Sequence, residues 1–342
     1  MSAVDRQMMS RALQLAAKGR YTSAPNPSVG CVIARDDSII GEGFTRPAGG
    51  NHGEIEALQQ ASDTAGATAY VTLEPCSHQG RTGPCADALV AAGISRVVIA
   101  CEDPNPEVAG SGIQKLKDAG IEVELGLMED QARESNRGFI KRHEQGMPWV
   151  TVKMAASLDG RTAMASGQSQ WITTPAARAD VQRLRAAQCA IITGIGTQKM
   201  DDPSLTVRIT RDDVGVEDEL RQPLRVVVDA RLQMSPEARM FQQPGDTLVA
   251  TLDGPEQRDR SAALEAAGAE VAFLPAMGEH IDLHALLVEL AGRGCNQVLV
   301  EAGAGLAGAF IAEGLLDELV CYWAPKLFGN EARPMFDLSI ET

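Results

Sequence analysis

The sequence is poor in aromatic residues, which make up only 4% of its 342 positions, so its cores must be built mainly from aliphatic side chains. No apolar run reaches the ~18 residues that a membrane-spanning helix needs. The first residues lack the basic and apolar regions of a secretory signal. These absences predict a cytoplasmic protein with no membrane segment.

Basic residues are also scarce: 31 Lys and Arg stand against 46 Asp and Glu, a net charge of −15. An acidic surface repels polyanions, so we expect neither nucleic acid nor an anionic membrane as a partner. A small phosphorylated ligand remains compatible with this charge, because a local cluster of cations acts at short range. The seven cysteines are odd in number and widely spaced, which predicts reduced thiols rather than a disulfide scaffold.

The length suggests two domains, at roughly 150 residues each. Strand-like and helix-like segments alternate, which predicts α/β domains at 1–146 and 147–342, divided at Gly146-Met-Pro148. We expect the charged stretch 209–222 to be an exposed insertion. The predicted helices are 3–18, 53–63, 84–92, 111–119, 129–144, 174–187, 258–267, 282–292 and 304–313. The predicted strands are 29–34, 38–41, 69–73, 96–101, 121–125, 149–154, 190–193, 224–229, 247–250, 270–273, 297–301 and 319–323.

The strongest chemical signal is His52-Gly-Glu54 followed by Pro-Cys76 and Pro-Cys85. One His and two Cys are ligands that suit Zn²⁺, with a fourth position left for water. His78 is the only other nearby candidate ligand, and its spacing from Cys76 strains tetrahedral geometry. The sequence therefore predicts an open, catalytic zinc site; the alternative is two core cysteines with a surface His–Glu pair.

Glu54 is the predicted acid/base of this site. Zn²⁺ with two thiolates and a neutral imidazole sums to zero charge, so it acidifies water less than a three-histidine site, and a separate base is needed. Residues i and i+2 do not share a helix face, so His52 should precede the helix with non-helical dihedrals. The pattern is typical of zinc nucleobase deaminases, although eight residues rather than two separate Cys76 from Cys85.

A second signal is the run Gly303-Ala-Gly305-Leu-Ala-Gly308, which follows a predicted strand and opens a helix. Its backbone N–H groups suit a dinucleotide pyrophosphate. The motif comes late in its domain and lacks an acidic residue about 20 positions onward, which favours a phosphate-binding turn in an α/β fold other than Rossmann. The alternative is close helix–strand packing only. Polar residues in 153–161 and 197–208 indicate either function or ordinary capped loops.

Together the motifs resemble the bifunctional deaminase–reductase family of riboflavin biosynthesis. The matching segments are NPSVGCVI at 26–33, LEPCSHQGRTGPC at 73–85, DPNP at 103–106, VAG at 108–110, ASLDGRT at 156–162, SQWIT at 169–173, DDP at 201–203, EAG at 301–303 and APK at 324–326. The resemblance implies a cytidine-deaminase-like domain followed by a dihydrofolate-reductase-like domain. It implies hydrolytic deamination of a diaminopyrimidinone ribosylamine 5′-phosphate and then NADPH reduction of the ribosyl group to ribityl.

The resemblance also implies residue roles, with Zn²⁺ held by His52, Cys76 and Cys85 and with Glu54 as acid/base. Deaminase substrate contacts would be Asn26, His78 and Arg81. NADPH contacts would be Ala155, Trp171, Thr197, Asp201, Ala230, Gly303, Ala304, Gly305, Leu306, Ala307, Gly308 and Ala309. Reductase substrate contacts would be Lys153, Ser169, Arg185, Leu205, Arg208 and Glu301, with the two Arg side chains suited to phosphate and with Lys153 or Glu301 opening the sugar or protonating its oxygen.

The sequence departs from the family at two positions near the first site. Gly53 stands where the family usually has Ala, and Thr45 stands where it often has His. The family also implies a homodimer or larger assembly, and a further strand after the last residues of this chain. Two rival hypotheses remain: a nucleic-acid base deaminase, and a nonenzymatic nucleotide-binding module with a structural zinc.

Overall fold

The computed structural model describes residues 1–342 except 79–82, 107, 165, 167–171 and 339–342. The chain forms two compact units: Met1–Gly146 with Arg211–Leu220, and Met147–Thr210 with Arg221–Thr342. The predicted domains differ from these units at residues 211–220, which group with the first unit. This segment contains the short helix α9 (Arg211–Val214), none of whose residues is buried.

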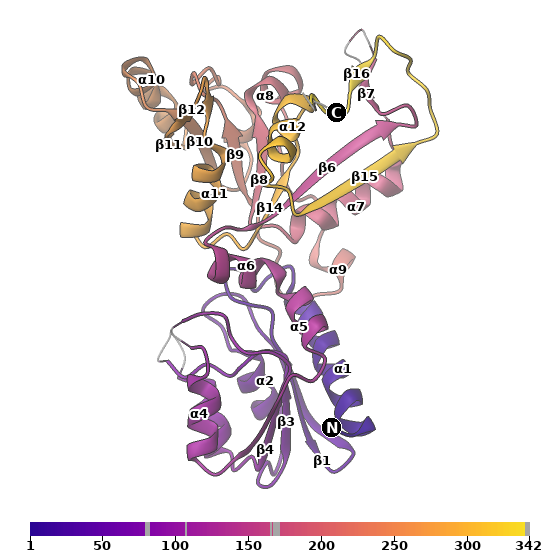
Figure 1. Ribbon diagram of the computed structural model, residues 1–342, viewed down its shortest axis with the longest axis vertical. Coiled ribbons are helices and arrows are strands. Elements are labelled where there is room, and N and C mark those ends of the chain that lie inside the picture. Colours follow the sequence, from indigo (N-terminus) through magenta and orange to yellow (C-terminus); the bar gives the residue numbers. More distant parts are fainter. Residues whose placement is uncertain (79–82, 107, 165, 167–171, 339–342) are drawn as a thin grey trace. The chain divides into compact units, whose positions relative to one another are not determined.

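The first unit is built on a five-stranded sheet of order β2-β1-β3-β4-β5, of which Figure 1 labels β1, β3 and β4. β1 runs antiparallel to β2 and β3, whereas β3, β4 and β5 run parallel. The strands are β1 (Gly30–Arg35), β2 (Ser38–Phe44), β3 (Thr68–Val71), β4 (Arg96–Ile99) and β5 (Glu122–Leu125). The core is mainly aliphatic, as the shortage of aromatics predicts; Ile33, Leu73, Leu89, Ile99 and Leu116 are fully or almost fully buried.

The helices of this unit are α1 (Ala3–Gly19), α2 (Gly53–Gln60), α3 (Cys85–Ala91), α4 (Ser111–Asp118), α5 (Glu129–Ser135) and α6 (Arg137–Gln145). The single helix predicted over 129–144 is wrong, because the chain breaks at Asn136. The Asn136 side chain accepts a hydrogen bond from Ser28 N at 2.8 Å and donates one to Ser28 O at 3.0 Å. An amide satisfied on both sides by a distant backbone holds this position out of helical geometry.

The second unit contains a seven-stranded sheet of order β11-β10-β9-β8-β14-β6-β15 (Figure 1). All neighbouring pairs in it are parallel. The strands are β6 (Trp149–Ser157), β8 (Ala190–Gly194), β9 (Leu224–Val228), β10 (Thr247–Leu252), β11 (Ala269–Leu274), β14 (Gln297–Val300) and β15 (Glu318–Ala324). Because parallel strands end at one edge of the sheet, the loops that follow them meet there, which is where open α/β sheets bind ligands.

The remaining elements of the second unit are short strands and helices around this sheet. They are β7 (Arg161–Ala163), α7 (Pro175–Ala186), α8 (Ile195–Asp201), a 3₁₀ turn (Arg239–Gln242), α10 (Pro255–Ala266), β12 (Ala276–Met277), β13 (His280–Ile281), α11 (Leu283–Gly292), α12 (Ala304–Ala312) and β16 (Arg333–Pro334). The sequence did not predict α8, whose seven residues are too few for a periodic apolar stripe. Among the helices that the structure describes, none combines the length and apolarity needed to span a bilayer.

Candidate active sites

The predicted metal ligands converge in the first unit. His52 is the N-cap of α2, with φ −77° and ψ 161°, which confirms the prediction that it precedes the helix in non-helical geometry. Cys76 lies in the loop between β3 and α3, and Cys85 is the first residue of α3. The His52 Nδ1 atom lies 3.6 Å from Cys76 Sγ and 3.3 Å from Cys85 Sγ. Three residues separated by up to 33 positions thus aim their donor atoms at one point.

The donor set fits Zn²⁺ in both chemistry and spacing. Ideal Zn–S and Zn–N bonds at tetrahedral angles put a sulfur and a nitrogen ligand about 3.6 Å apart. Among the described residues, His52, Cys76 and Cys85 form the one group of metal-ligating side chains whose donor atoms lie within 4.8 Å of one another. His78 is exposed and does not belong to this group. Three protein ligands leave a tetrahedral centre with one position for a small molecule, as in catalytic zinc sites.

Glu54 lies beside these ligands in the first turn of α2 and is only 3% exposed. Burial raises the pKa of its carboxyl group to about 7, against the favourable effect of His52 on the charged form. The neighbouring thiols of Cys76 and Cys85 also affect the pKa of Glu54, in opposite directions. Hydrogen bonding to Cys85, and then to His52, lowers the pKa of the Cys76 thiol, which favours the thiolate that a metal ion binds.

Glu74, which the sequence reasoning missed, holds the Cys76 loop in place. Its buried carboxylate accepts hydrogen bonds from the backbone N–H groups of Gly110 at 3.0 Å and Ile113 at 3.1 Å, at the start of α4. Asp103 N donates to the same carboxylate at 3.3 Å. A Glu two residues before a ligand Cys is the only signal that the sequence offers for this role.

The structure describes two of the three predicted contacts to the deaminase substrate. Asn26 lies half-buried in the turn before β1, and its N–H donates to Ser23 O at 3.0 Å. His78 is exposed in the loop after Cys76. Arg81 lies outside the described residues, so its role stays a prediction.

The two departures from the family meet at one backbone carbonyl. A Cβ built on Gly53 would lie 2.8 Å from Val29 O, closer than real Cβ atoms come. Thr45 holds that same residue: its N–H donates to Val29 O at 2.9 Å, and its Oγ1 accepts from Val29 N at 3.0 Å. Thr45 is therefore a buried structural residue here, and Gly53 leaves room for the carbonyl that Thr45 fixes.

The predicted NADPH contacts gather at the carboxyl edge of the seven-stranded sheet. Ala155 lies near the end of β6, Thr197 and Asp201 lie on α8 after β8, and Ala230 follows β9. The glycine-rich turn follows β14, the neighbour of both β8 and β6. Trp171 lies outside the described residues. One sheet edge thus brings together segments that are up to about 150 positions apart in the sequence.

The three glycines of the turn have different roles. Gly303 is the N-cap of α12, and a Cβ there would have Thr197 Oγ1 as its nearest neighbour at 3.7 Å. A Cβ on Gly305 would have no atom within 4 Å among the described residues, whereas one on Gly308 would collide with the backbone of Asp337. The packing explanation therefore holds for Gly308 only, and Gly303 and Gly305 leave an open surface at the helix start, as a phosphate group requires.

A buried cluster of charges forms the predicted reductase substrate site. The Lys153 Nζ atom on β6 lies 3.0 Å from Glu301 Oε2, just after β14, and Arg185 on α7 pairs with the same carboxylate. Arg185 also donates to Thr206 O at 3.2 Å. Leu205 is buried with a φ of 47°, and Arg208 follows it. Ser169 lies outside the described residues.

The polar stretch after β6 has a structural use. Ser157 Oγ donates to Asp159 Oδ1 at 2.5 Å, and Asp159 Oδ2 accepts from Phe328 N at 3.0 Å and Gly329 N at 2.8 Å. These bonds tie the turn after β6 to the loop after β15. For this stretch the ordinary capped-loop alternative accounts for the contacts of Ser157 and Asp159.

Two family models match the chain, one in each half. The RibD C-terminal domain matches residues 148–340, and the cytidine and deoxycytidylate deaminase zinc-binding region matches residues 2–101. The riboflavin biosynthesis protein RibD of Escherichia coli K12 is 49% identical over 340 residues, covering 98% of this chain and 91% of the relative. That of Haemophilus influenzae is 48% identical over 343 residues, covering 98% and 90%.

Solved structures of similar proteins share the whole architecture. The RibD of Acinetobacter baumannii superposes with a TM-score of 0.88 at 47% identity, covering 99% of this chain and 92% of the other. A Thermotoga maritima protein, described as a diaminohydroxyphosphoribosylaminopyrimidine deaminase/5-amino-6-(5-phosphoribosylamino)uracil reductase, gives a TM-score of 0.84 at 33% identity, covering 99% and 93%. The likeness therefore extends over both units.

Proposed function

The chain belongs to the RibD family of riboflavin biosynthesis proteins, and on that premise we propose that its two sites divide the two reactions of the family between them. The chain is a bifunctional deaminase and reductase whose substrate is a pyrimidine ribosylamine phosphate. We assign deamination to residues 1–146 and reduction to residues 147–342. The convergence of His52, Cys76 and Cys85 beside the buried Glu54 is the observation that carries this assignment.

In the first site the protein's contribution to hydrolysis is proton transfer. A zinc ion bound by His52, Cys76 and Cys85 supplies Lewis-acid activation of water. Glu54 accepts a proton from the water that attacks the ring carbon bearing the 2-amino group, and later donates a proton to the amine, which leaves as ammonia. The burial of Glu54 suits both roles, because its raised pKa lies near neutral pH. Asn26, His78 and Arg81 are the proposed contacts to the deaminase substrate.

In the second site NADPH, when bound, supplies the hydride that reduces the sugar carbon of the opened ribosyl group. The backbone N–H groups of the turn from Gly303 to Ala309 are the proposed contacts to its pyrophosphate. Ala155, Trp171, Thr197, Asp201 and Ala230 complete the proposed cofactor contacts. Those that the structure describes lie near the end of a strand of the parallel sheet or after one.

Lys153 is the proposed proton donor to the sugar oxygen. Glu301, the alternative donor, has its pKa held at about 2 because Lys153 and Arg185 outweigh the effect of burial. An ionised carboxylate has no proton to give, so it serves to orient the Lys153 ammonium group at 3.0 Å. Ser169, Leu205 and Arg208 are the other proposed substrate contacts, together with Arg185.

The remaining proposals concern partners and compartment. All seven cysteines are free, which favours a reducing compartment such as the cytoplasm. The charge of −15 favours a small substrate over a nucleic-acid partner. We carry over from the family resemblance a homodimer or larger assembly, which light scattering after size-exclusion chromatography would test.

The decisive experiment combines metal analysis of the purified chain with separate assays of the two half-reactions. We expect about one zinc per chain, ammonia release from the diaminopyrimidinone ribosylamine phosphate, and NADPH oxidation with the purified deaminated intermediate. Lys153→Met should abolish NADPH oxidation and leave ammonia release unchanged. Absence of zinc, or loss of both reactions in that variant, would refute the division of labour.

A further inference from the structure

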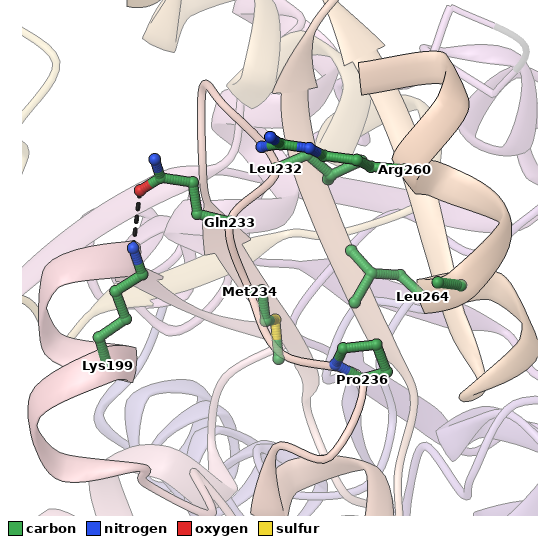
Figure 2. A pocket seen from close by; sticks show the side chains of 8 residues that line it. Lys199, Leu232, Gln233, Met234, Pro236, Arg260 and Leu264 are labelled. Carbon is green, nitrogen blue, oxygen red and sulfur yellow. Dashed lines mark hydrogen bonds between the residues drawn. The ribbon is translucent and has the colours of Figure 1, made fainter. Parts of the chain in front are cut away.

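A pocket of about 400 Å³ opens at the carboxyl edge of the seven-stranded sheet, away from the predicted substrate residues. Figure 2 shows its walls: Lys199 projects from α8, Leu232, Gln233 and Met234 lie on the segment after β9, and Arg260 and Leu264 project from α10. None of the residues assigned above to NADPH or to the substrate lines it. The pocket therefore has no role in the function described so far.

The floor of the pocket is apolar and rigid. Leu232, Met234 and Leu264 are 3%, 4% and 2% exposed, so packed apolar side chains close the floor, and a ring would lie against only the small part of each that reaches the surface. The segment is fixed by Asp229, whose Oδ2 accepts hydrogen bonds from Gln233 N at 2.5 Å and Met234 N at 2.8 Å. Leu232, in the same segment, adopts the left-handed region with φ 50°.

Two cations stand at the rim of the pocket. Lys199 Nζ donates to Gln233 Oε1 at 2.7 Å, as the dashed line in Figure 2 marks, and its charge also acts on the carboxylate of Asp229. Arg260 donates to Arg231 O at 3.1 Å and forms an ion pair with the exposed Glu256 at 2.5 Å. An apolar floor with two cations above it suits a flat aromatic ring that carries a phosphate monoester.

The position of the pocket relates it to the glycine-rich turn. Neighbouring strands lie about 4.8 Å apart, and β9 is separated from β14 only by β8, so the two loops lie about 10 Å apart along the edge. α8 connects them: Thr197 Oγ1 lies beside Gly303, and Lys199 follows two residues later. Ala230, a proposed NADPH contact, leads directly into the segment that forms the floor.

We propose that this pocket binds the adenosine end of NADPH, and that Lys199 and Arg260 bind its 2′-phosphate and so select NADPH over NADH. This inference rests on the reductase activity of the second unit. The glycine-rich turn supplies the pyrophosphate contacts that both cofactors share. The two cations supply contacts that only the phosphorylated cofactor can use, and so they are specificity-determining residues.

Calorimetric titration with nucleotide fragments tests the inference without turnover. The probes are adenosine 2′,5′-bisphosphate and ADP, added to the intact chain and to the variants Lys199→Gln and Arg260→Gln. We expect each variant to bind the bisphosphate about tenfold more weakly, the loss of one charge-assisted contact, and to bind ADP as the native chain does. Arg258→Gln is the matched control, because Arg258 lies on the same helix but outside the pocket.

Three outcomes would overturn the inference. The first is equal binding of the two nucleotides by the native chain, and the second is an equal loss of bisphosphate binding in Arg258→Gln. The third is displacement of the bisphosphate by ribose 5-phosphate, which would mean that the pocket binds the phosphate of the substrate. The proposed function is tested separately, by NADPH oxidation with the deaminated intermediate. If that reaction proceeds while the variants keep native nucleotide binding, only the assignment of Lys199 and Arg260 fails.

Discussion

Arg185 donates two hydrogen bonds to Glu301, from Nε to Oε1 at 2.5 Å and from Nη2 to Oε2 at 3.1 Å. Lys153 Nζ lies 3.0 Å from Oε2 of the same carboxylate. Burial alone would raise the pKa of Glu301, but the two cations outweigh it and hold the pKa at about 2. The substrate site is thus built on an ionised carboxylate that forms ion pairs with Lys153 and Arg185 and attracts Arg208 from a longer distance.

The first prediction concerns the pH dependence of stability. A carboxyl group whose pKa is lowered in the folded state stabilises the fold above its unfolded pKa, and this contribution is lost as the pH falls through the folded pKa. Glu301→Gln should therefore cost about 3–5 kcal/mol in the free energy of unfolding at neutral pH. The cost should shrink as the pH falls from the ordinary value of 4.5 towards 2. Urea unfolding over this range measures it.

Glu270→Gln is the control for that series. Glu270 pairs with Arg293 at 2.5 Å, but its side chain is 59% exposed, so removing its charge should cost less than about 1 kcal/mol. A difference between the native chain and Glu301→Gln that stays constant with pH would show that the carboxylate is not held ionised by its partners.

The second prediction separates metal binding from proton transfer. Glu54→Gln keeps the shape of the side chain and removes its acid/base function, so ammonia release should fall by about 10²- to 10⁴-fold. Zinc content should stay at the native level, because Glu54 is not one of the converging ligands. Glu56→Gln, on the same helix, should retain deamination. Deamination at the native rate in Glu54→Gln would contradict the assigned role, and NADPH oxidation with the deaminated intermediate should be unaffected.

The third prediction concerns the room that Gly53 leaves for Val29. Ala at position 53 would place its Cβ 2.8 Å from Val29 O, which Thr45 holds in place, so Gly53→Ala should destabilise the first unit by about 1–3 kcal/mol. This exceeds the gain of up to about 1 kcal/mol in helix propensity. Thr45→Val removes the Oγ1 contacts with Val29 N and Val29 O and keeps only the backbone N–H bond, so the carbonyl is held less tightly. In the double variant the loss should therefore be smaller than the sum of the two single losses. Strictly additive losses in urea unfolding would rule out this coupling.

The sequence allowed most of the element order and the metal ligands to be predicted, for identifiable reasons. Buried parallel strands appear as continuous apolar runs, and the zinc ligands are unusual residue types at unusual spacing. What it could not reveal depends on contacts between distant residues. The break at Asn136 comes from hydrogen bonds to Ser28, 108 positions away. Glu74 acts through the start of α4, and the pocket of Lys199 and Arg260 exists only once α8 and α10 flank the segment after β9.

The last prediction concerns Arg208 and the substrate phosphate. Arg185 is bound to Glu301 and Thr206 O, whereas Glu301 acts on Arg208 only through a longer-range attraction. Burial and the neighbouring Arg185 lower the pKa of Arg208, so an anion that binds between the two guanidinium groups relieves their repulsion. Arg208→Gln should therefore raise the KM for the phosphorylated intermediate about tenfold, with little change in kcat. Arg208→Lys, which keeps the charge but not the fork of donors, should recover part of that loss. A variant whose KM for the intermediate is unchanged would place the phosphate elsewhere on the sheet edge.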